Sequence, residues 1–444
     1  MQIIAHEPFP VSSRTAGQCP FKIIALLACV ALAMSACKTT PTHDAAVDDR
    51  QQTAAYAHLE PEEAARELFS KGQALIHQGK AQEASATFSE LERRFGQDPR
   101  RSVRAILAQA LSLKAQSAAS PTESLGIQLE IGRRYGEDID PALRRQIVTA
   151  MFNQAETLVS KEGNISAAIP IYREIEQTYG NGDGKDKSWG VRALLYQGDL
   201  QRQMRNTKAA VAAYERLDQR FGQESDPAIR TVIADALFKK GEILAEQGNT
   251  RAAVAAYDEI NRRYAEDRDA GFRLRAARAL FAKGSLLGKQ GMGEEPDSET
   301  PSVNTRPVGD SAAAVAVYDD IIQRFGRDKD PNIHNIVGGT LLKKSETLRL
   351  TGDDQGTIAT YDEIVRHFGN DDTQVSRVLV ATALFRKGLT LGKQEGGLNA
   401  AIAAFDELTR RFASDTHPNV RKIVGQAITA RQKLTTEMEP MHDN

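Results

Sequence analysis

The residue types that most often perform chemistry are sparse in this 444-residue chain, and their spacing does not suit it. No two of the eight histidines stand four positions apart, and none neighbours a cysteine in the body of the chain, which argues against a metal site. Motifs of the form G-x-S-x-G, H-E-x-x-H and G-x-x-x-x-G-K-[ST] do not occur. We therefore expect no catalytic residue, no metal ion and no cofactor.

Two further patterns resemble parts of binding or catalytic sites but are better explained as ordinary structure. The stretch GNGDGKDKS (180–188) lacks the Lys-Ser/Thr step of a phosphate loop and follows no strand, and its glycine and glutamate positions do not match a calcium loop. The adjacent acids Asp258/Glu259 and Asp362/Glu363 would diverge by about 100° on a helix, so they cannot converge on one substrate. We interpret 180–188 as an inter-helix loop and the paired acids as a solvated helix face.

The cysteines, Cys19, Cys29 and Cys37, all lie near the start of the chain. The segment FKIIALLACVALAMSACKTT has a lysine, an apolar run at 23–34 and small residues before Cys37, which is the pattern of a secretory signal peptide. The run is too short to span a bilayer. The ending M-S-A-C resembles the lipobox of bacterial lipoproteins. This resemblance implies a lipoprotein signal peptide at 1–36 and a lipid on Cys37. The residues that follow are polar and lack a helical stripe until their end, which predicts a flexible tether at 37–62.

Other interpretations of this N-terminal segment remain open. A plain signal peptide could be cleaved nearby, and LLAC, ending at Cys29, matches the lipobox more closely but has a shorter apolar run before it. A misassigned start with a cytoplasmic protein is the third alternative, which cell fractionation decides. Lys38 follows the expected lipidated residue, where an Asp usually marks inner-membrane retention in Gram-negative bacteria. The resemblance therefore implies a protein anchored in the outer membrane and facing the periplasm.

The composition favours a helical protein and argues against a nucleic-acid partner. Hydrophobic residues make up 41% of the chain and charged residues 26%, whereas aromatic residues make up only 6%, which favours closely packed helices. The net charge is −2, and basic residues are interspersed with acidic ones instead of forming a stripe.

One short sequence recurs along the chain. AAVAAYDEINRRY (252–264) returns in similar form at 312–325, 357–368 and 401–412. When the copies are aligned on their closing aromatic residue, eight units of about 43 residues cover 63–412, with an insertion at 291–310. Residues 413–444 follow as a capping helix and tail. The closing aromatics are Phe95, Tyr135, Tyr179, Phe221, Tyr264, Phe325, Phe368 and Phe412.

Each unit shows two helical halves and the signals of helix ends. Ala253, Tyr257, Ile260 and Tyr264 are spaced so that they share one helix face. Helix starts are indicated by four Asp-Pro pairs: Asp98-Pro99, Asp140-Pro141, Asp226-Pro227 and Asp330-Pro331. Glycines after the closing aromatics suit helix ends that need a positive φ: Gly96, Gly136, Gly180, Gly222, Gly326 and Gly369.

This unit resembles a tetratricopeptide repeat. Residues at that family's signature positions are Ala236, Leu237, Gly241, Leu244, Gly248, Ala253, Tyr257 and Ile260. The pattern recurs at Gly198/Ala210/Tyr214, Gly284/Ala314/Tyr318 and Gly388/Ala401/Phe405. The resemblance implies an all-α, right-handed α-solenoid of about eight helix pairs, in which small residues let the two helices approach and the aromatic fills the space between them.

The sequence also departs from the family. The units carry roughly nine residues beyond the family's length of 34, which we expect in a longer first helix. A lysine replaces the usual apolar residue before the small one, at Lys240, Lys283, Lys344 and Lys387. The second unit (100–136) matches least well, because Gln128 replaces its inner aromatic.

In this family partner peptides lie along the surface formed by the first helices. The matching positions are Phe69, Phe152, Phe238, Phe281 and Phe385. Phe238, Phe281 and Phe385, together with Glu242, Ser285 and Leu389 four residues later, are our six candidates for partner contact. The phenylalanines stand beside packing positions, so a role in the core remains open for them.

We therefore expect a non-catalytic interaction scaffold of the bacterial cell envelope. Its partners would be one or more envelope proteins, with the membrane reached through the N-terminal lipid and no nucleic acid bound. The alternative is a glycan-binding or glycan-processing envelope protein, which would need an acidic cluster with a raised pKa in a cleft.

Overall fold

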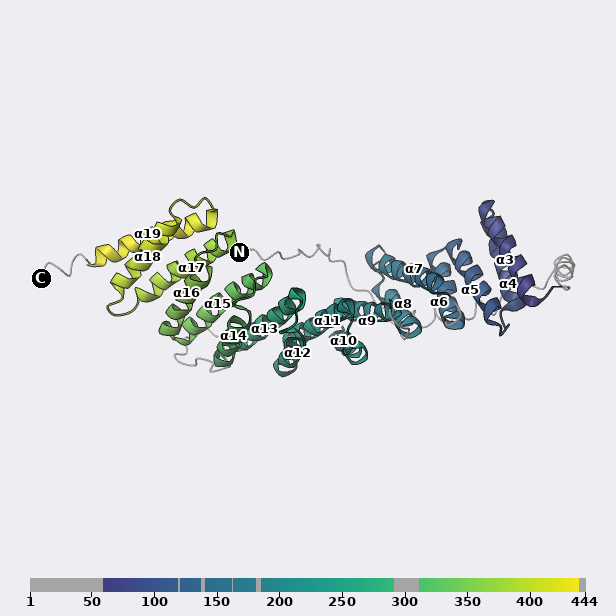
Figure 1. Cartoon of the computed structure of the whole chain (residues 1–444), viewed down its shortest axis with the longest axis horizontal. Helices are drawn as coiled ribbons and strands as arrows, with labels where there is room; N and C mark the ends of the chain where they lie inside the picture. The colour runs from purple at the N-terminus through teal and green to yellow at the C-terminus, as the bar shows by residue number, and fades with distance from the viewer. Residues whose placement is uncertain are drawn as a thin grey trace, which may run out of the picture. The chain divides into compact units, whose positions relative to one another are not determined.

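The computed structural model describes residues 59–118, 120–136, 140–161, 163–180, 185–290 and 311–438. Within these ranges the chain forms seventeen α-helices and no β-strand (Figure 1). Successive helices make eight pairs, and a single helix follows them. The predicted all-α solenoid is therefore confirmed, with the expected number of pairs and the expected terminal helix.

Each pair consists of a first and a second helix. The pairs are α3 (Pro61–His77) with α4 (Ala81–Phe95), α5 (Arg101–Gln116) with α6 (Pro121–Tyr135), α7 (Pro141–Ser160) with α8 (Ile165–Tyr179), α9 (Lys185–Gln203) with α10 (Thr207–Phe221), α11 (Pro227–Glu246) with α12 (Thr250–Tyr264), α13 (Ala270–Gln290) with α14 (Ser311–Phe325), α15 (Pro331–Thr351) with α16 (Asp354–Phe368), and α17 (Gln374–Leu391) with α18 (Leu398–Phe412). The last helix, α19, spans Pro418–Met438.

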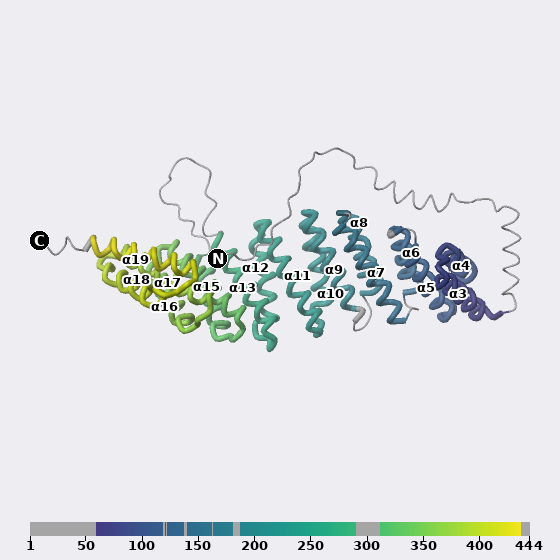
Figure 2. Tube along the Cα trace, turned by 90° about the horizontal axis from the view of Figure 1, so that it is seen from above, coloured from purple at the N-terminus to yellow at the C-terminus, as the bar shows by residue number. Residues whose placement is uncertain are grey.

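The chain divides into two compact units, Met1–Ala110 and Leu111–Asn444. In the first unit α3 packs against α4. In the second, each helix from α7 to α19 packs against the next (Figure 2), and the first helices from α9 onward also contact each other in series, ending at α19. The boundary between the units falls inside α5, in the repeat whose sequence matches least well.

The extra length of these repeats lies in the first helices, as predicted. From α7 to α17 the first helices contain 18 to 21 residues. Every second helix contains 15 residues. A longer first helix gives each pair more outward surface on that helix than on its partner.

Aspartate caps start three of the first helices as the sequence predicts. The side chains of Asp140, Asp226 and Asp330 accept hydrogen bonds from backbone N–H groups of the first turn, and a proline follows each one. Asp98 behaves differently, because α5 begins only at Arg101. Its carboxylate instead accepts hydrogen bonds from the backbone and side chain of Arg100.

The prediction that glycines after the closing aromatics have a positive φ is wrong. Their φ values lie between −55° and −74° at Gly96, Gly136, Gly180, Gly222 and Gly369, and Gly326 is not among the positive-φ glycines. Alanine holds the same right-handed conformation at Ala265 and Ala413, so a glycine is not required there. The chain leaves each second helix by continuing its right-handed turn. The positive φ occurs instead between the two helices of a pair, at Gly79, Gly163, Gly248, Gly352 and Gly396.

Within a pair, a glycine of the first helix faces the inner aromatic ring of the second. A Cβ added at Gly241 would stand 2.5 Å from Cε1 of Tyr257, whose side chain is 3% exposed. The same contact is made by Gly72 with Phe88, Gly198 with Tyr214, Gly284 with Tyr318, and Gly388 with Phe405. In the second repeat the residue at the inner aromatic position, Gln128, is buried, and its side-chain oxygen has no hydrogen-bond partner, which costs free energy.

The lysines that depart from the family pattern form ion pairs between successive repeats. Lys283 of α13 forms an ion pair with Asp258 of α12 at 2.6 Å, and the lysine side chain is 19% exposed. Asp258 therefore joins two helices in addition to facing solvent, whereas its neighbour Glu259 pairs within α12 with Arg262 and Arg263. The equivalent pairs, each 25 residues apart, are Glu215–Lys240, Asp319–Lys344, Asp362–Lys387 and Asp406–Arg431.

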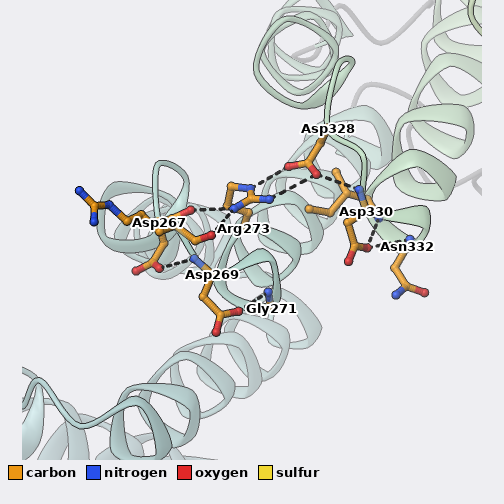
Figure 3. A network of polar contacts seen from close by, with 9 residues as sticks. Asp267, Asp269, Gly271, Arg273, Asp328, Asp330 and Asn332 are labelled. Atoms are coloured by element: carbon orange, nitrogen blue, oxygen red, sulfur yellow. Dashed lines mark hydrogen bonds and ion pairs between the residues drawn. The ribbon is translucent and has the colours of Figure 1, made fainter.

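A second recurring contact joins the loops between pairs, as Figure 3 shows for Arg273. Its Nε bonds the Asp328 carboxylate at 2.7 Å, while Nη1 bonds the backbone carbonyls of Asp267 and Arg268 at 2.9 and 2.8 Å. The hydrogen bond from Arg273 lowers the pKa of Asp328. A basic residue makes the corresponding contact in other repeats: Lys187–Glu224, Arg230–Asp267, His334–Asp371 and Arg377–Asp415.

Candidate protein-interaction face

The outward side chains of α9, α11, α13, α15 and α17, together with those of α7, form what we call the first-helix face. Among the described residues, six large apolar side chains are at least 37% exposed. All six lie on first helices, just after α9 or on α19, and none lies on a second helix: Tyr196, Met204, Leu350, Val375, Leu389 and Ile428. Single exposed apolar residues are ordinary. Their restriction to one series of helices distinguishes this face from the rest of the surface.

Phe238 lies in a hollow on this face. Its half-buried ring packs on Tyr257 of α12, with the centroids 5.6 Å apart. Leu195, Ala234 and Ile260 complete the apolar lining of the hollow, whose volume is about 360 Å³. The ring therefore serves the core on one side and borders an accessible hollow on the other, so both roles considered from the sequence are compatible with its position.

Ion pairs between neighbouring first helices fix the rim of this hollow. They are Lys239–Asp199 at 2.6 Å, Glu242–Arg202 at 2.8 Å and Asp235–Arg275 at 2.9 Å. Glu242, a predicted contact residue, is therefore already held by a partner within the chain. Burial, with Glu242 nearby, raises the pKa of Tyr257 to about 12, so this phenol remains neutral at physiological pH. Four of the five charged side chains that line the hollow are thus engaged in ion pairs within the chain.

Arg278 is the rim cation that forms no ion pair within the described residues. Its guanidinium lies 5.7 Å from the centroid of the Phe238 ring, and its side chain is exposed. Arg192 occupies the same repeat position two pairs earlier and is also exposed without an ion pair in the described part of the chain. It lies 5.2 Å from the centroid of the Phe152 ring. An arginine over a phenylalanine is stabilised by the ring and keeps its outer N–H groups available.

An aromatic cluster surrounds the Arg192 position. Tyr196 of α9 stacks on Tyr172 of α8 at 5.2 Å and meets the edge of Phe152 at 6.1 Å. Tyr172 is 4% exposed and Tyr196 is 37% exposed, so the cluster extends from the core to the surface. Burial raises the pKa of Tyr172 to about 12, and both Glu156 and Arg192 are close enough to influence it.

The remaining candidates lie further along the same face. Ser285 lines a second hollow of about 320 Å³ between α13 and α15, together with Tyr318 and Leu350. Burial raises the pKa of Tyr318, and hydrogen bonds with Ser285 and Thr347 partly offset this effect. Phe281 is half-buried, and its ring lies within 3.9 Å of the position a Cβ would take at Gly339 of α15.

The pair α17–α18 repeats the arrangement in part. Phe385 packs on Phe405 at 5.9 Å, as Phe238 packs on Tyr257. Leu389 is 43% exposed on the same helix. The six sequence candidates therefore share one face but do not meet in a single pocket: Phe238 and Glu242 border one hollow, Ser285 borders another, and Leu389 lies open.

Sequence reasoning missed Arg192, Arg278 and Tyr196. Their positions relative to the predicted phenylalanines provided the only available signal: Arg192 and Arg278 each stand 40 residues after a first-helix phenylalanine, Phe152 or Phe238. Aligning each first helix with the first helix of the next repeat would have revealed these arginines.

Several predictions fall outside the described residues. The signal peptide, Cys37 and most of the tether lie within 1–58, the insertion covers 291–310, and 181–184 holds part of the expected loop. Among the described residues, no helix has the length and apolarity needed to cross a membrane. The same residues contain no group of three or more His, Cys, Asp or Glu side chains that could hold a metal ion.

Two segments of the chain, residues 192–223 and 235–267, match the tetratricopeptide repeat family. No curated protein matches the chain in sequence. Solved structures similar to it include a tetratricopeptide repeat protein from Parabacteroides merdae ATCC 43184 (12% identity over 82% of this chain and 98% of that chain, TM-score 0.27). A Rap protein complexed with competence and sporulation factor gives 13% identity over 84% and 99%, with a TM-score of 0.30. Cex1p gives 13% identity over 82% and 70%, with a TM-score of 0.39. The matched segments comprise α10, α12 and most of α9 and α11, so these helices form tetratricopeptide-like repeats.

Proposed function

We propose that this chain is a non-catalytic protein–protein interaction scaffold of the bacterial cell envelope. A lipid on Cys37 would anchor it in the outer membrane, facing the periplasm. Its first-helix face would bind an extended segment or a helix of another envelope protein. Tetratricopeptide-like repeats support the scaffold role. The M-S-A-C sequence and Lys38 support the anchor and its location.

The observation that carries this proposal is that no exposed large apolar side chain of the described residues lies on a second helix, while hollows with apolar lining open on the first-helix face. Two hollows of about 360 and 320 Å³ open between consecutive first helices. Ion pairs hold the rim of the larger one, so little ordering of the receptor accompanies binding. A groove of this kind suits peptide recognition.

The carboxyl groups favour a scaffold over a glycan-processing enzyme. A glycosidase needs one carboxylic acid with a raised pKa beside a second carboxylate. In the second unit, hydrogen bonds from Arg273, Lys343 and Ser376 instead lower the pKa values of Asp328, Glu346 and Asp371 respectively. These carboxylates stay ionised and serve as ion-pair and hydrogen-bond acceptors.

In-cell photo-crosslinking tests the scaffold. A photoreactive amino acid would replace Glu242 or Ser285, with exposed Ala255 of the second helix α12 as the matched control position. We expect one recurrent envelope protein to be crosslinked from Glu242 and Ser285 but not from Ala255. Equal yields from all three positions, or glycan retained without any protein, would contradict the proposal.

Cell fractionation tests the anchor separately. Cys37→Ser should release the protein from membranes while leaving its helical circular dichroism spectrum unchanged, because Cys37 precedes the folded repeats. A variant that stays in the outer-membrane fraction would contradict lipidation at this residue. Cys29→Ser serves as the control, since Cys29 is the competing lipobox position.

A further inference from the structure

We propose that the part of the first-helix face between α7 and α13 recognises an extended acidic peptide. Each of its two anchor points takes an apolar side chain next to a carboxylate, and the anchors stand about six residues apart in the peptide. This inference rests on the proposed scaffold function and specifies the chemistry of the partner.

The apolar half of each anchor is defined by aromatic rings. At the hollow, Phe238 and Leu195 present apolar surface in a space of about 360 Å³. At the earlier position, the half-buried Phe152 and the exposed Tyr196 supply the aromatic rings, whose centroids lie 6.1 Å apart. Aromatic residues combined with arginine are the side chains that most often dominate binding energy at interfaces.

The acidic half follows from the charge on the rim. Five charged residues line the hollow, three of them basic and two acidic. Asp235 and Glu242 are already paired with Arg275 and Arg202. Arg278 therefore remains as the cation that a ligand carboxylate can meet, and a guanidinium offers a carboxylate two parallel hydrogen bonds.

The earlier anchor has the same construction with a weaker charge. Arg192 lies over Phe152 as Arg278 lies over Phe238. Glu156 stands near the same aromatic cluster, so the local charge there is closer to neutral. We therefore expect the Phe238–Arg278 anchor to contribute more of the selectivity for acidic peptides.

The spacing of the two anchors sets the peptide length. The anchors are two repeats apart, and packed helices lie about 8–10 Å from each other, which gives a separation of about 20 Å. An extended chain rises about 3.3 Å per residue, so about six residues cover that distance. A peptide with both apolar-acidic pairs at this spacing engages both anchors at once and gains affinity from that linkage.

A simpler explanation for the two arginines is that each only shields its phenylalanine from water. That role would change stability when the arginine is replaced but would leave binding untouched. Arg192→Gln and Arg278→Gln separate the two explanations, because both side chains are exposed and their removal leaves no cavity. Arg262→Gln is the matched control, an exposed arginine on the second helix α12.

The experiment measures fluorescence anisotropy of a labelled, end-blocked peptide, Gly-Leu-Asp-Gly-Ser-Gly-Ser-Leu-Asp-Gly, with the purified full chain. Blocked ends ensure that binding does not come from a terminal carboxylate. Comparison peptides replace both Asp by Asn, or replace the second Leu-Asp by Gly-Ser. We expect both comparison peptides to bind roughly tenfold more weakly. Arg192→Gln and Arg278→Gln should each weaken the parent peptide by about fivefold to tenfold, and Arg262→Gln should not.

Equal affinity for the Asp and Asn peptides would overturn this inference, as would no saturable binding up to about 1 mM or no effect of the two arginine variants. Photo-crosslinking then separates the two levels of the proposal. If Arg278→Gln still captures the same envelope protein from Glu242 with full yield, the acidic-peptide inference fails and the scaffold stands. If the parent chain captures no protein from Glu242 or from Ser285, the scaffold proposal itself fails.

Discussion

The contact between Gly241 and Tyr257 can be tested with Gly241→Ala. We expect this substitution to destabilise the chain when the Tyr257 ring is present and to stabilise it when the ring is removed. Gly241→Ala alone improves helix propensity by about 1 kcal/mol. It also places a Cβ 2.5 Å from the ring of Tyr257, a residue that is only 3% exposed. Overpacking of this kind costs about 1–3 kcal/mol. We expect a net loss of about 1 kcal/mol in the free energy of unfolding.

Removing the ring reverses this result. Tyr257→Ala alone should cost about 3–5 kcal/mol, because a large buried side chain is lost. In that background Gly241→Ala no longer meets the ring and should stabilise the chain by about 1 kcal/mol. The two substitutions are therefore coupled by about 1–3 kcal/mol, which is measurable for residues in direct contact.

Urea unfolding followed by circular dichroism, combined with hydrogen exchange of α11 and α12, measures the effect. Exchange is needed because repeat proteins unfold in segments, so a single transition need not report on one pair. Gly425→Ala on α19 is the matched control, since nothing lies within 4 Å of the added Cβ, and it should be stabilising. If Gly241→Ala in the parent chain stabilises as much as Gly425→Ala does, the packing argument is wrong.

Three further predictions concern the contacts between repeats. Arg273→Ala should lower the free energy of unfolding by about 1–2 kcal/mol in urea titrations, because it removes hydrogen bonds to two successive loops between pairs. The control Arg262→Ala, at an exposed arginine, should change the free energy of unfolding by less than about 0.5 kcal/mol. Because Arg273 lowers the folded-state pKa of Asp328, this pair stabilises the fold above the ordinary aspartate pKa and loses its contribution as pH falls through the lowered value. The urea midpoint of the parent chain should therefore fall more steeply below about pH 4 than that of Arg273→Ala; parallel curves would contradict this. His334→Arg should raise the free energy of unfolding at pH 8 by about 0.5 kcal/mol, because it restores the permanently charged partner found at this position in the neighbouring repeats. An unchanged free energy of unfolding would mean that Asp371 gains nothing from the arginine.

The fold could be predicted because its signal repeats. The spacing of Ala253, Tyr257 and Ile260 fixes one helix face, and eight copies of a similar pattern leave little freedom in how the helices pair. The glycine prediction failed for a local reason. A glycine after a helix is compatible with either sign of φ, and the chain here continues in the right-handed region, as Ala265 does at the same place.

The binding face was predictable only in part. The positions of Phe238 and Phe385 follow from the family resemblance, because the first helices carry the partner surface. The rim could not be predicted, since Lys239–Asp199 and Glu242–Arg202 each join residues 40 positions apart on different helices. Which arginines are left without a partner depends on all such pairs together. That information exists only once the helices are placed side by side.

The pair α13–α14 shows what determines the register of a repeat. Its two helices are separated in sequence by 291–310, whereas three residues, 247–249, separate α11 from α12. Yet Gly284 faces Tyr318 with the same 2.5 Å Cβ distance as Gly241 facing Tyr257. The connector between paired helices can therefore change length without altering the contact that defines the pair. Such a turn is a natural point for evolution, or an engineer, to insert a new domain, and whole repeats could be duplicated or deleted while those that remain keep their internal packing.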